Sequence, residues 1–335
     1  MRIQRAVAGV AAASALALVA ACSGGSGAPA SQETGAGGTT PATEDALTIG
    51  FVPGIASDPF FLAMQLGAED KAEEMGIELI WQGAPDEYSP QSQIPFVDTM
   101  LTQQVDGLII VPTDPDALQP SVAEAVSMDI PVITVDTTVT DQSDLVSHIT
   151  GDNVDGGRLA GHTLAEQIGG EGKVFLMSGS PTATTNTLRE QGFMEALEEY
   201  PDIELVGKEY ANSQPAAATS AVSTVLLKHP DLAGIFAVDG TSGTGTVAAL
   251  RNNDKVGEVA LIGYDAYENQ VADLQDGAFT ALVAQKPGDM AGLALEYIVA
   301  AINGDDSAVE SDVVMENVVI TQENFDETKQ YQYPS

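Results

Sequence analysis

Short apolar segments alternate with longer amphipathic segments along most of the chain. The apolar segments are rich in β-branched residues, which is typical of buried strands. They cover residues 47–52, 77–81, 107–111, 132–136, 173–178, 203–206, 234–238, 259–264 and 280–284. The first segment between them has helical periodicity, because Phe61, Met64, Ala68, Ala72 and Met75 fall on one face. Further helices are predicted over residues 115–128, 154–168, 187–199, 216–228, 246–252 and 290–302.

The spacing of the predicted strands repeats. Strand starts at 47, 77, 107 and 132 are 30, 30 and 25 residues apart, and starts at 173, 203, 234 and 259 are 30, 31 and 25 apart. Alternating strands and helices predict parallel sheets covered on both faces. The repeat therefore predicts an α/β protein with two similar doubly wound parallel-sheet lobes, joined by a hinge and separated by a ligand cleft. We assign residues 46–150 and 286–308 to the N-terminal lobe, and residues 151–285 and 309–335 to the C-terminal lobe.

A separate apolar segment lies at the N-terminus. Arg2 and Arg5 precede a largely apolar run over residues 6–21, which at 16 residues is shorter than the roughly 20 that a spanning helix needs. The run ends in small residues followed by Cys22, the only cysteine of the chain, and this arrangement resembles a bacterial lipobox. The resemblance implies a lipoprotein signal peptide over residues 1–21 and a diacylglycerol anchor on the Cys22 thiol.

The segment after Cys22 has the composition of a linker. Residues 23–44 are rich in Gly, Ser, Ala, Thr and Pro and contain no large apolar residue. Such a composition is typical of a flexible tether, which we assign to residues 22–45. The sequence therefore predicts an extracytoplasmic protein, held at the outer face of the cytoplasmic membrane or in the periplasm by its lipid.

The charge and the scarcity of Cys and His exclude several kinds of function. The chain has 12 Lys and Arg against 49 Asp and Glu, and its formal net charge is −37. A nucleic-acid partner needs a basic surface, so none is expected. One Cys excludes an intrachain disulfide and a thiolate metal cluster, and three scattered His offer little for a zinc site. We expect no metal and no cofactor, and we interpret most of the acidity as solvated surface.

Polar residues follow the predicted strands at their carboxyl ends. They are Asp58, Asp114, Asp136, Ser180, Asp239, Asp265 and Gln285. Ligands of parallel α/β sheets bind beyond these ends, so two facing lobes would place the polar groups in one cleft. Asp also caps helix N-termini well, and for Asp58 and Asp114 capping is an equal alternative to ligand contact.

Four motifs in this chain resemble those of type I periplasmic sugar-binding proteins, in particular the ribose-binding kind. They are SDPFF at 57–61, PVITVD at 131–136, ITGDN at 149–153 and LIGYD at 261–265. The resemblance extends in order over residues 47–303. It implies ligand contacts by Asp58, Phe60, Phe61, Asp136, Arg189, Asp239, Asp265 and Gln285.

The chemistry of these side chains suits a polyhydroxylated ligand. Carboxylates accept hydroxyl hydrogen bonds, a guanidinium donates a planar fork, and an amide does both. Phe60 and Phe61 would cover the C–H face of a sugar, or would instead pack as a hydrophobic staple of the helix that follows. Arg189 would bind sugar, or would instead be a charge on a helix surface.

The chain departs from the ribose pattern. Thr137 and Val111 stand where the family has Arg and Asn, and residues 211–218 lack an aromatic residue found there in the family. We therefore expect a sugar, a polyol or a related polar ligand other than ribose. The WQGAP sequence at 81–85 is more similar to the autoinducer-2 and rhamnose branch, and Tyr264 and Tyr267 are candidates to replace the missing ring.

No catalytic motif is apparent, and no nucleotide loop is present, because neither Gly-Lys pair, at 172–173 and at 207–208, is followed by Ser or Thr. The sequence predicts a monomeric, lipid-anchored solute-binding protein that passes its ligand to the permease subunits of an ABC importer. One alternative is a sensory lipoprotein that presents a ligand such as autoinducer-2 to a receptor. Another is a glycosidase that uses Asp136 and Asp265.

Overall fold

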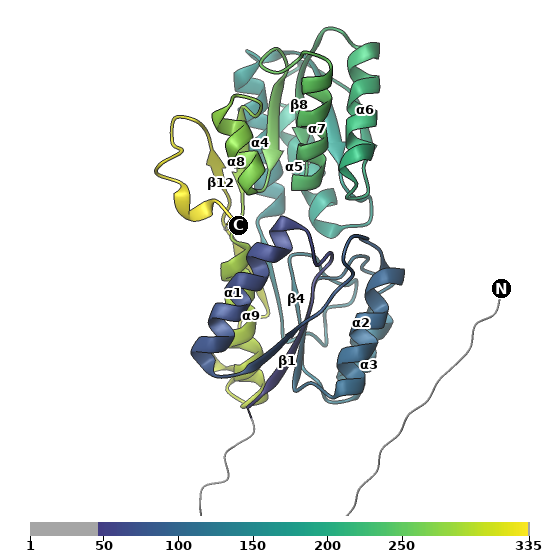
Figure 1. Ribbon diagram of the computed structural model, residues 1–335, viewed down its shortest axis with the longest axis vertical. Coiled ribbons are helices and arrows are strands. Elements are labelled where there is room, and N and C mark those ends of the chain that lie inside the picture. The colour runs from purple at the N-terminus through teal and green to yellow at the C-terminus, as the bar shows by residue number, and fades with distance from the viewer. Residues whose placement is uncertain (1–45, 334–335) are drawn as a thin grey trace, which may run out of the picture. The chain divides into compact units, whose positions relative to one another are not determined.

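The computed structural model of the protein describes residues 46–333 (Figure 1). The predicted signal peptide over 1–21, the anchor at Cys22 and the tether over 22–45 lie outside these residues. Within 46–333, no helix is long and apolar enough to cross a membrane.

The N-terminal lobe is built on a six-stranded parallel sheet with the order β11-β5-β4-β3-β1-β2. Its strands are β1 (Thr48–Val52), β2 (Glu78–Trp81), β3 (Gly107–Ile110), β4 (Val132–Val135), β5 (Ser147–Gly151) and β11 (Asp312–Met315). Its helices are α1 (Pro59–Met75), α2 (Pro90–Gln103), α3 (Gln119–Ser127) and α9 (Pro287–Ile302). Successive strand residues point to opposite faces, so Ile109 packs with α1 and α9, whereas Leu108 and Ile110 pack with α2 and α3.

The C-terminal lobe has a second six-stranded sheet with the order β12-β10-β9-β8-β6-β7. Its strands are β6 (Glu171–Ser178), β7 (Asp202–Tyr210), β8 (Leu232–Ala237), β9 (Ala260–Tyr264), β10 (Ala281–Ala284) and β12 (Val318–Ile320). Its helices are α4 (Asn153–Gln167), α5 (Thr184–Leu197), α6 (Pro215–Lys228), α7 (Gly240–Asn252) and α8 (Glu268–Gln275). The pairs are parallel except that β12 runs antiparallel to β10. Two 3₁₀ turns, η1 (Asp306–Ala308) and η2 (Lys329–Tyr331), flank the last strands in sequence.

These two α/β lobes confirm the predicted fold class, and every strand predicted from the apolar segments is present. Helix α2 was not predicted, because Pro95 and several polar residues interrupt its periodicity. Helix α3 begins at Gln119 rather than at 115, since the Asp114 carboxylate accepts hydrogen bonds from the backbone N–H groups of Asp116 and Ala117 in a turn.

The predicted boundary after residue 308 is wrong for one segment. Strand β11 pairs with β5 along its whole length, so residues 312–315 belong to the N-terminal sheet rather than to the C-terminal lobe. The chain crosses between the lobes three times: at Asp152, at Gln285–Lys286 and at Glu316–Asn317.

Two of the crossings are tied to each other by hydrogen bonds. The Asp152 N–H donates to the Met315 carbonyl (2.8 Å), and the Asn317 Nδ2 donates to the Asp152 carbonyl (2.6 Å). Short adjacent segments of this kind are where hinge rotation between two lobes is absorbed. Figure 1 shows the two sheets with their helices on either side of this junction.

Helices α4 and α5 approach closely because glycines face each other across their contact. A Cβ on Gly157 would collide with the backbone carbonyl of Arg189, and a Cβ on Gly192 would collide with that of Val154. This close contact fixes the backbone of α5 at Arg189.

We predict that Gly192→Ala destabilises the protein by about 1–3 kcal/mol, because the added methyl group must push α4 and α5 apart. Urea unfolding followed by circular dichroism measures the loss. Gly292→Ala in α9 is the matched control, since its Cβ would make only ordinary contact with Lys71. Equal stability of the two variants would contradict the account of this helix contact.

Candidate functional site

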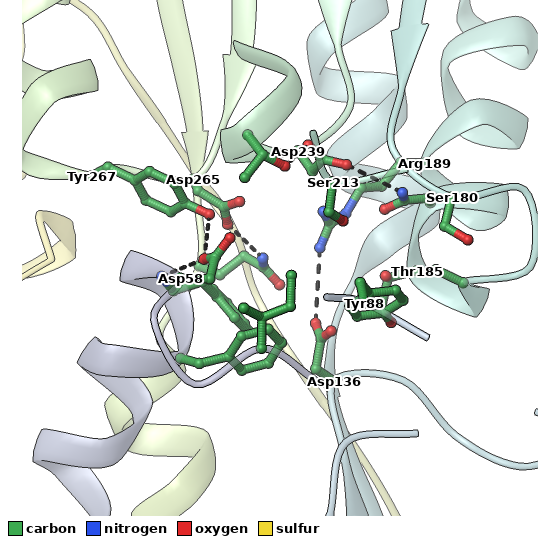
Figure 2. Close-up of a pocket in the computed structure, with 17 residues that line it drawn as sticks. Asp58, Tyr88, Asp136, Ser180, Thr185, Arg189, Ser213, Asp239, Asp265 and Tyr267 are labelled. Atoms are coloured by element: carbon green, nitrogen blue, oxygen red, sulfur yellow. Dashed lines mark hydrogen bonds and ion pairs between the residues drawn. The ribbon is translucent and has the colours of Figure 1, made fainter. Parts of the chain in front are cut away.

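A cleft between the lobes contains all the residues predicted to bind ligand (Figure 2). It encloses about 490 Å³ of unfilled space, including its open mouth. The N-terminal lobe contributes Asp58, Phe60, Phe61 and Asp136, and the C-terminal side contributes Arg189, Asp239, Asp265 and Gln285. The structure thus brings the eight residues together, while their contact with a ligand stays a prediction.

Two carboxylates occupy equivalent positions in the two lobes. Asp136 follows β4 and Asp265 follows β9, and both adopt left-handed backbone conformations with φ of 63° and 71°. The Asp136 N–H donates to the carbonyl of Ile149 and the Asp265 N–H donates to that of Val283, each at 2.8 Å. Asp tolerates this conformation better than most residues. The shared geometry turns each carboxylate from its strand end into the cleft.

The Asp265 carboxylate is fixed by three donors. Its Oδ2 accepts from the Gly240 N–H (3.0 Å), and its Oδ1 accepts from Gln285 Nε2 (2.9 Å) and from the Tyr333 hydroxyl (3.0 Å). Burial raises the pKa of Asp265, although Arg189 and these hydrogen bonds oppose the shift. Asp265 is therefore a rigid part of the cleft wall.

Arg189 is buried beneath the cleft, with 3% of its surface exposed, so the alternative of a surface helix charge is wrong. Its Nε donates to Asn153 Oδ1 (2.8 Å) and its Nη1 donates to the Val238 carbonyl (3.1 Å). The guanidinium lies 3.7 Å from the centre of the Tyr264 ring. Nη2 is left facing the other lobe, 3.9 Å from Asp136 Oδ1 (Figure 2).

Two aspartates both cap a helix and line the cleft. Asp58 caps α1 by accepting from the Phe60 N–H (2.9 Å), and Asp239 caps α7 by accepting from the Ser242 N–H (2.7 Å). Both line the cleft, whereas Asp114 does not line it. The structure bears out neither alternative for Asp114, because its carboxylate accepts from Asp116 and Ala117 in a turn before α3 and caps no helix.

The aromatic residues of the cleft differ in part from those expected. Phe60 and Phe61 line it edge to face, with ring centroids 5.2 Å apart. Tyr267 also lines it, but Tyr264 lies fully buried under Arg189 and does not replace a ligand-facing ring. Tyr88 lines the cleft and was missed; the one sequence signal for it is an aromatic residue in the polar loop after a strand.

The C-terminal segment returns to the site, which no sequence pattern indicated. The Tyr333 N–H donates to the Ala266 carbonyl (3.0 Å), and the Tyr333 hydroxyl reaches Asp265. Its ring centroid lies 6.1 Å from that of Phe60 in the other lobe and 6.0 Å from that of Tyr267. Close by, the Tyr267 hydroxyl donates across the cleft to Asp58 Oδ1 (2.7 Å). The lobes therefore touch beside the cleft.

Two buried oxygens in the cleft lack a hydrogen-bond partner: Asp136 Oδ1 and Gln285 Oε1. Buried polar atoms usually have a partner, so both mark places where a ligand would donate. Burial raises the pKa of Asp136 to about 7 against the opposing effect of Arg189. Burial likewise raises the pKa of Asp58 to about 7, although the hydrogen bonds from Tyr267 and Phe60 oppose it.

Two α/β lobes with a polar cleft at the carboxyl ends of their strands form the architecture of a ligand-binding protein. The chain belongs to the periplasmic binding protein family, since the model of the periplasmic binding protein domain matches residues 49–306. The family comprises solute-binding proteins rather than enzymes, so the prediction of a non-enzymatic protein is confirmed and the glycosidase alternative is set aside.

Two curated relatives cover most of the chain. The ribose import binding protein of Bacillus subtilis (strain 168) is 29% identical over 250 residues, covering 75% of this chain and 80% of that protein. The xylitol-binding protein of Mycolicibacterium smegmatis is 28% identical over 290 residues, covering 86% of this chain and 81% of that protein.

Solved structures are similar over the same region. An ABC transporter solute-binding protein from Agrobacterium vitis, bound with α-D-tagatopyranose, has a TM-score of 0.83 at 29% identity and covers 86% of this chain and 100% of its own. A solute-binding protein from Actinobacillus succinogenes with bound D-allose has a TM-score of 0.78 at 29% identity. The similarity covers 84% of this chain and 99% of that protein.

We predict that closure of the ligand-free lobes depends on pH. Opening should expose Asp58 and Asp136 to water and return their pKa from about 7 to the ordinary 3.8, so the closed form binds more protons. The resulting stabilisation of the closed form is complete below pH 3.8 and is lost as the pH rises to about 7. The distance between fluorophores on the two lobes should therefore be shorter at pH 5 than at pH 8.

The double variant Asp58→Asn/Asp136→Asn is the control for this measurement. Asn keeps the helix cap at 58 and tolerates the left-handed backbone at 136, but does not titrate. The difference in distance between the two pH values should then be much smaller, and Asp265, whose pKa burial also raises, accounts for any remainder. A pH-independent distance in the unmodified protein would contradict the assignment.

Proposed function

We propose that the protein captures a sugar or polyol in the cleft between its lobes and delivers it to the permease of an ABC importer. The observation that carries this proposal is the arrangement of Arg189 Nη2, Asp136 Oδ1 and Gln285 Oε1 in one cleft with aromatic walls. A guanidinium donor and two open acceptors suit hydroxyl groups, and the rings of Phe60 and Phe61 suit the C–H face of a sugar.

Ligand binding and lobe closure are expected to be coupled. Gln285 lines the cleft and lies in one of the crossings between the lobes, and Asn153, which holds Arg189, directly follows another at Asp152. A ligand that contacts both lobes binds the closed form better than the open form, and this differential affinity is what shifts the equilibrium.

The ligand is expected to differ from ribose. Thr137 stands where the family pattern for ribose has Arg, and its hydroxyl donates to the Pro112 carbonyl (2.6 Å) rather than lining the cleft. Val111, in place of an Asn, is fully buried. The relatives that bind xylitol, tagatose and allose make a polyol or another sugar the favoured ligand.

Delivery to a permease is supported by a groove on the outer surface that both lobes form. Leu62 and Leu66 of α1 are 42% and 40% exposed, and they lie with Glu268 and Asn269 of α8 and with Tyr333 around this groove. Because its two sides come from different lobes, the groove changes shape when the lobes move. A permease that recognises it would distinguish the closed, loaded form.

Binding can be tested with Asp136→Asn, which removes the charge of an acceptor that makes no side-chain hydrogen bond within the protein. A thermal-shift screen of sugars and polyols identifies the ligand, and calorimetry measures its affinity. We expect about a tenfold or greater loss, because a charge-assisted hydrogen bond is replaced by a neutral one.

Asp114→Asn is the matched control for that test, since Asp114 also follows a strand but lies outside the cleft. It should bind as the unmodified protein does. Unchanged affinity in Asp136→Asn, with an unchanged melting temperature, would contradict the site. Failure of every sugar and polyol to bind would contradict the ligand class.

We also propose that Cys22 carries the lipid that holds the protein outside the cytoplasmic membrane. Two acyl chains on its glycerol would give stable anchoring. Cys22→Ser should therefore move the protein from the membrane fraction to the soluble fraction of the cells that produce it, and should abolish labelling by radioactive palmitate. Ser23→Ala, one residue further on, should leave both unchanged. Retention of the Cys22→Ser variant in membranes, still labelled, would contradict the anchor.

A further inference from the structure

The charges in the cleft are unbalanced. Asp58, Asp136, Asp239 and Asp265 line it, and among the described side chains of the lining Arg189 is the one cation. With all of them ionised the net charge is 1 − 4 = −3. Arg189 faces Asp136, whereas the other three carboxylates accept only from neutral donors.

Three of these carboxylates share one region. Asp58 and Asp265 lie on the Tyr267 side of the cleft, as Figure 2 shows, and Tyr267 donates to Asp58. Asp265 accepts from the N–H of Gly240, the residue next to Asp239. Burial raises the pKa of Asp265, and the negative charge of Asp239 adds to this rise. Arg189, which faces Asp136, also acts electrostatically on Asp265, so one guanidinium is shared among several carboxylates and their burial is costly.

The unpaired hydrogen-bonding atoms of the cleft also favour a ligand that donates hydrogen bonds. Its unpaired buried atoms, Asp136 Oδ1 and Gln285 Oε1, are both acceptors, and the two residues are 8% and 1% exposed. Several cleft donors are already engaged, since the amide groups of Gln285 and Asn186 donate to Asp265 and Asp239. Two of the guanidinium nitrogens of Arg189 are engaged as well. A complementary ligand must therefore supply donors.

We propose that the ligand is a polyhydroxylated amine, such as an amino sugar or an amino polyol, whose ammonium group lies among Asp58, Asp239 and Asp265. An ammonium provides three donors, no acceptor and the missing positive charge. Sugar acids and sugar phosphates are excluded by the same carboxylates. This inference rests on the proposed function, because it specifies the ligand of the same cleft.

Protonation of the carboxyl groups is the competing way to relieve their repulsion. Asp58 faces Tyr267, Asp239 and Asp265, and burial raises its pKa to about 7 without a ligand. A cationic ligand would keep Asp58 ionised, so its binding should release protons from this carboxyl group near neutral pH. A neutral polyol would leave the protonation of Asp58 unchanged.

The test compares matched ligands that differ in one group. The sets are glucose, glucosamine and glucuronate; galactose, galactosamine and galacturonate; and sorbitol, glucamine and gluconate. Calorimetry at pH 7.5 should show that the amine of at least one set binds about tenfold or more tightly than its neutral partner, and that the acids do not bind. Repeating the titration in buffers of different ionisation enthalpy should show proton release for the amine.

Asp58→Asn and Asp239→Asn each keep a helix-capping side chain and remove one charge. Each should reduce the preference for the amine, whereas Asp114→Asn should not. Neutral sugars that bind as tightly as their amines would overturn the inference and leave the proposed function standing. If no amine binds, the inference is also overturned. If no sugar or polyol of the wider screen binds either, the proposed function falls with it.

Discussion

The buried guanidinium of Arg189 is the interaction on which the site depends. Arg189 belongs to α5. Its guanidinium donates to Asn153 at the start of α4 and to the Val238 carbonyl just after β8, and it lies against the Tyr264 ring of β9. Its remaining nitrogen faces Asp136 of the other lobe. A buried charge is costly unless it is surrounded by acceptors, so each of these contacts constrains the others. Arg189 therefore connects three parts of the molecule: the C-terminal sheet, the first crossing between the lobes, and the cleft.

The cleft exists because one strand-end geometry occurs in both lobes. Asp136 and Asp265 leave their strands in the same left-handed conformation and are anchored to the neighbouring strand by the same hydrogen bond. The capping aspartates of α1 and α7 then complete a ring of acceptors. The aspartates that end the strands and those that cap the helices therefore concentrate negative charge between the two lobes. This concentration makes the cleft selective for donors.

The sequence predicted nine of the strands, because buried strands depend on short-range patterns, and the structure brings the eight residues predicted to bind ligand into one cleft. Buried strands show as apolar runs, and residues such as Asp136 and Asp265 directly follow them. Features that depend on distant contacts were not visible. Strand β11 is short and half-exposed, and its place in the sheet comes from pairing with β5. Tyr333 reaches Asp265 only because the end of the chain folds back, and the burial of Arg189 results from partners far away in sequence.

The central claim is that the open acceptors and the guanidinium between the lobes bind the ligand. A crystal structure of the protein with its tightest-binding ligand tests this most directly. The account predicts ligand donors within about 3 Å of Asp136 Oδ1 and Gln285 Oε1, and a ligand oxygen that accepts from Arg189 Nη2. A ligand bound elsewhere, or bound in the cleft with these two oxygens still unpaired, would contradict it.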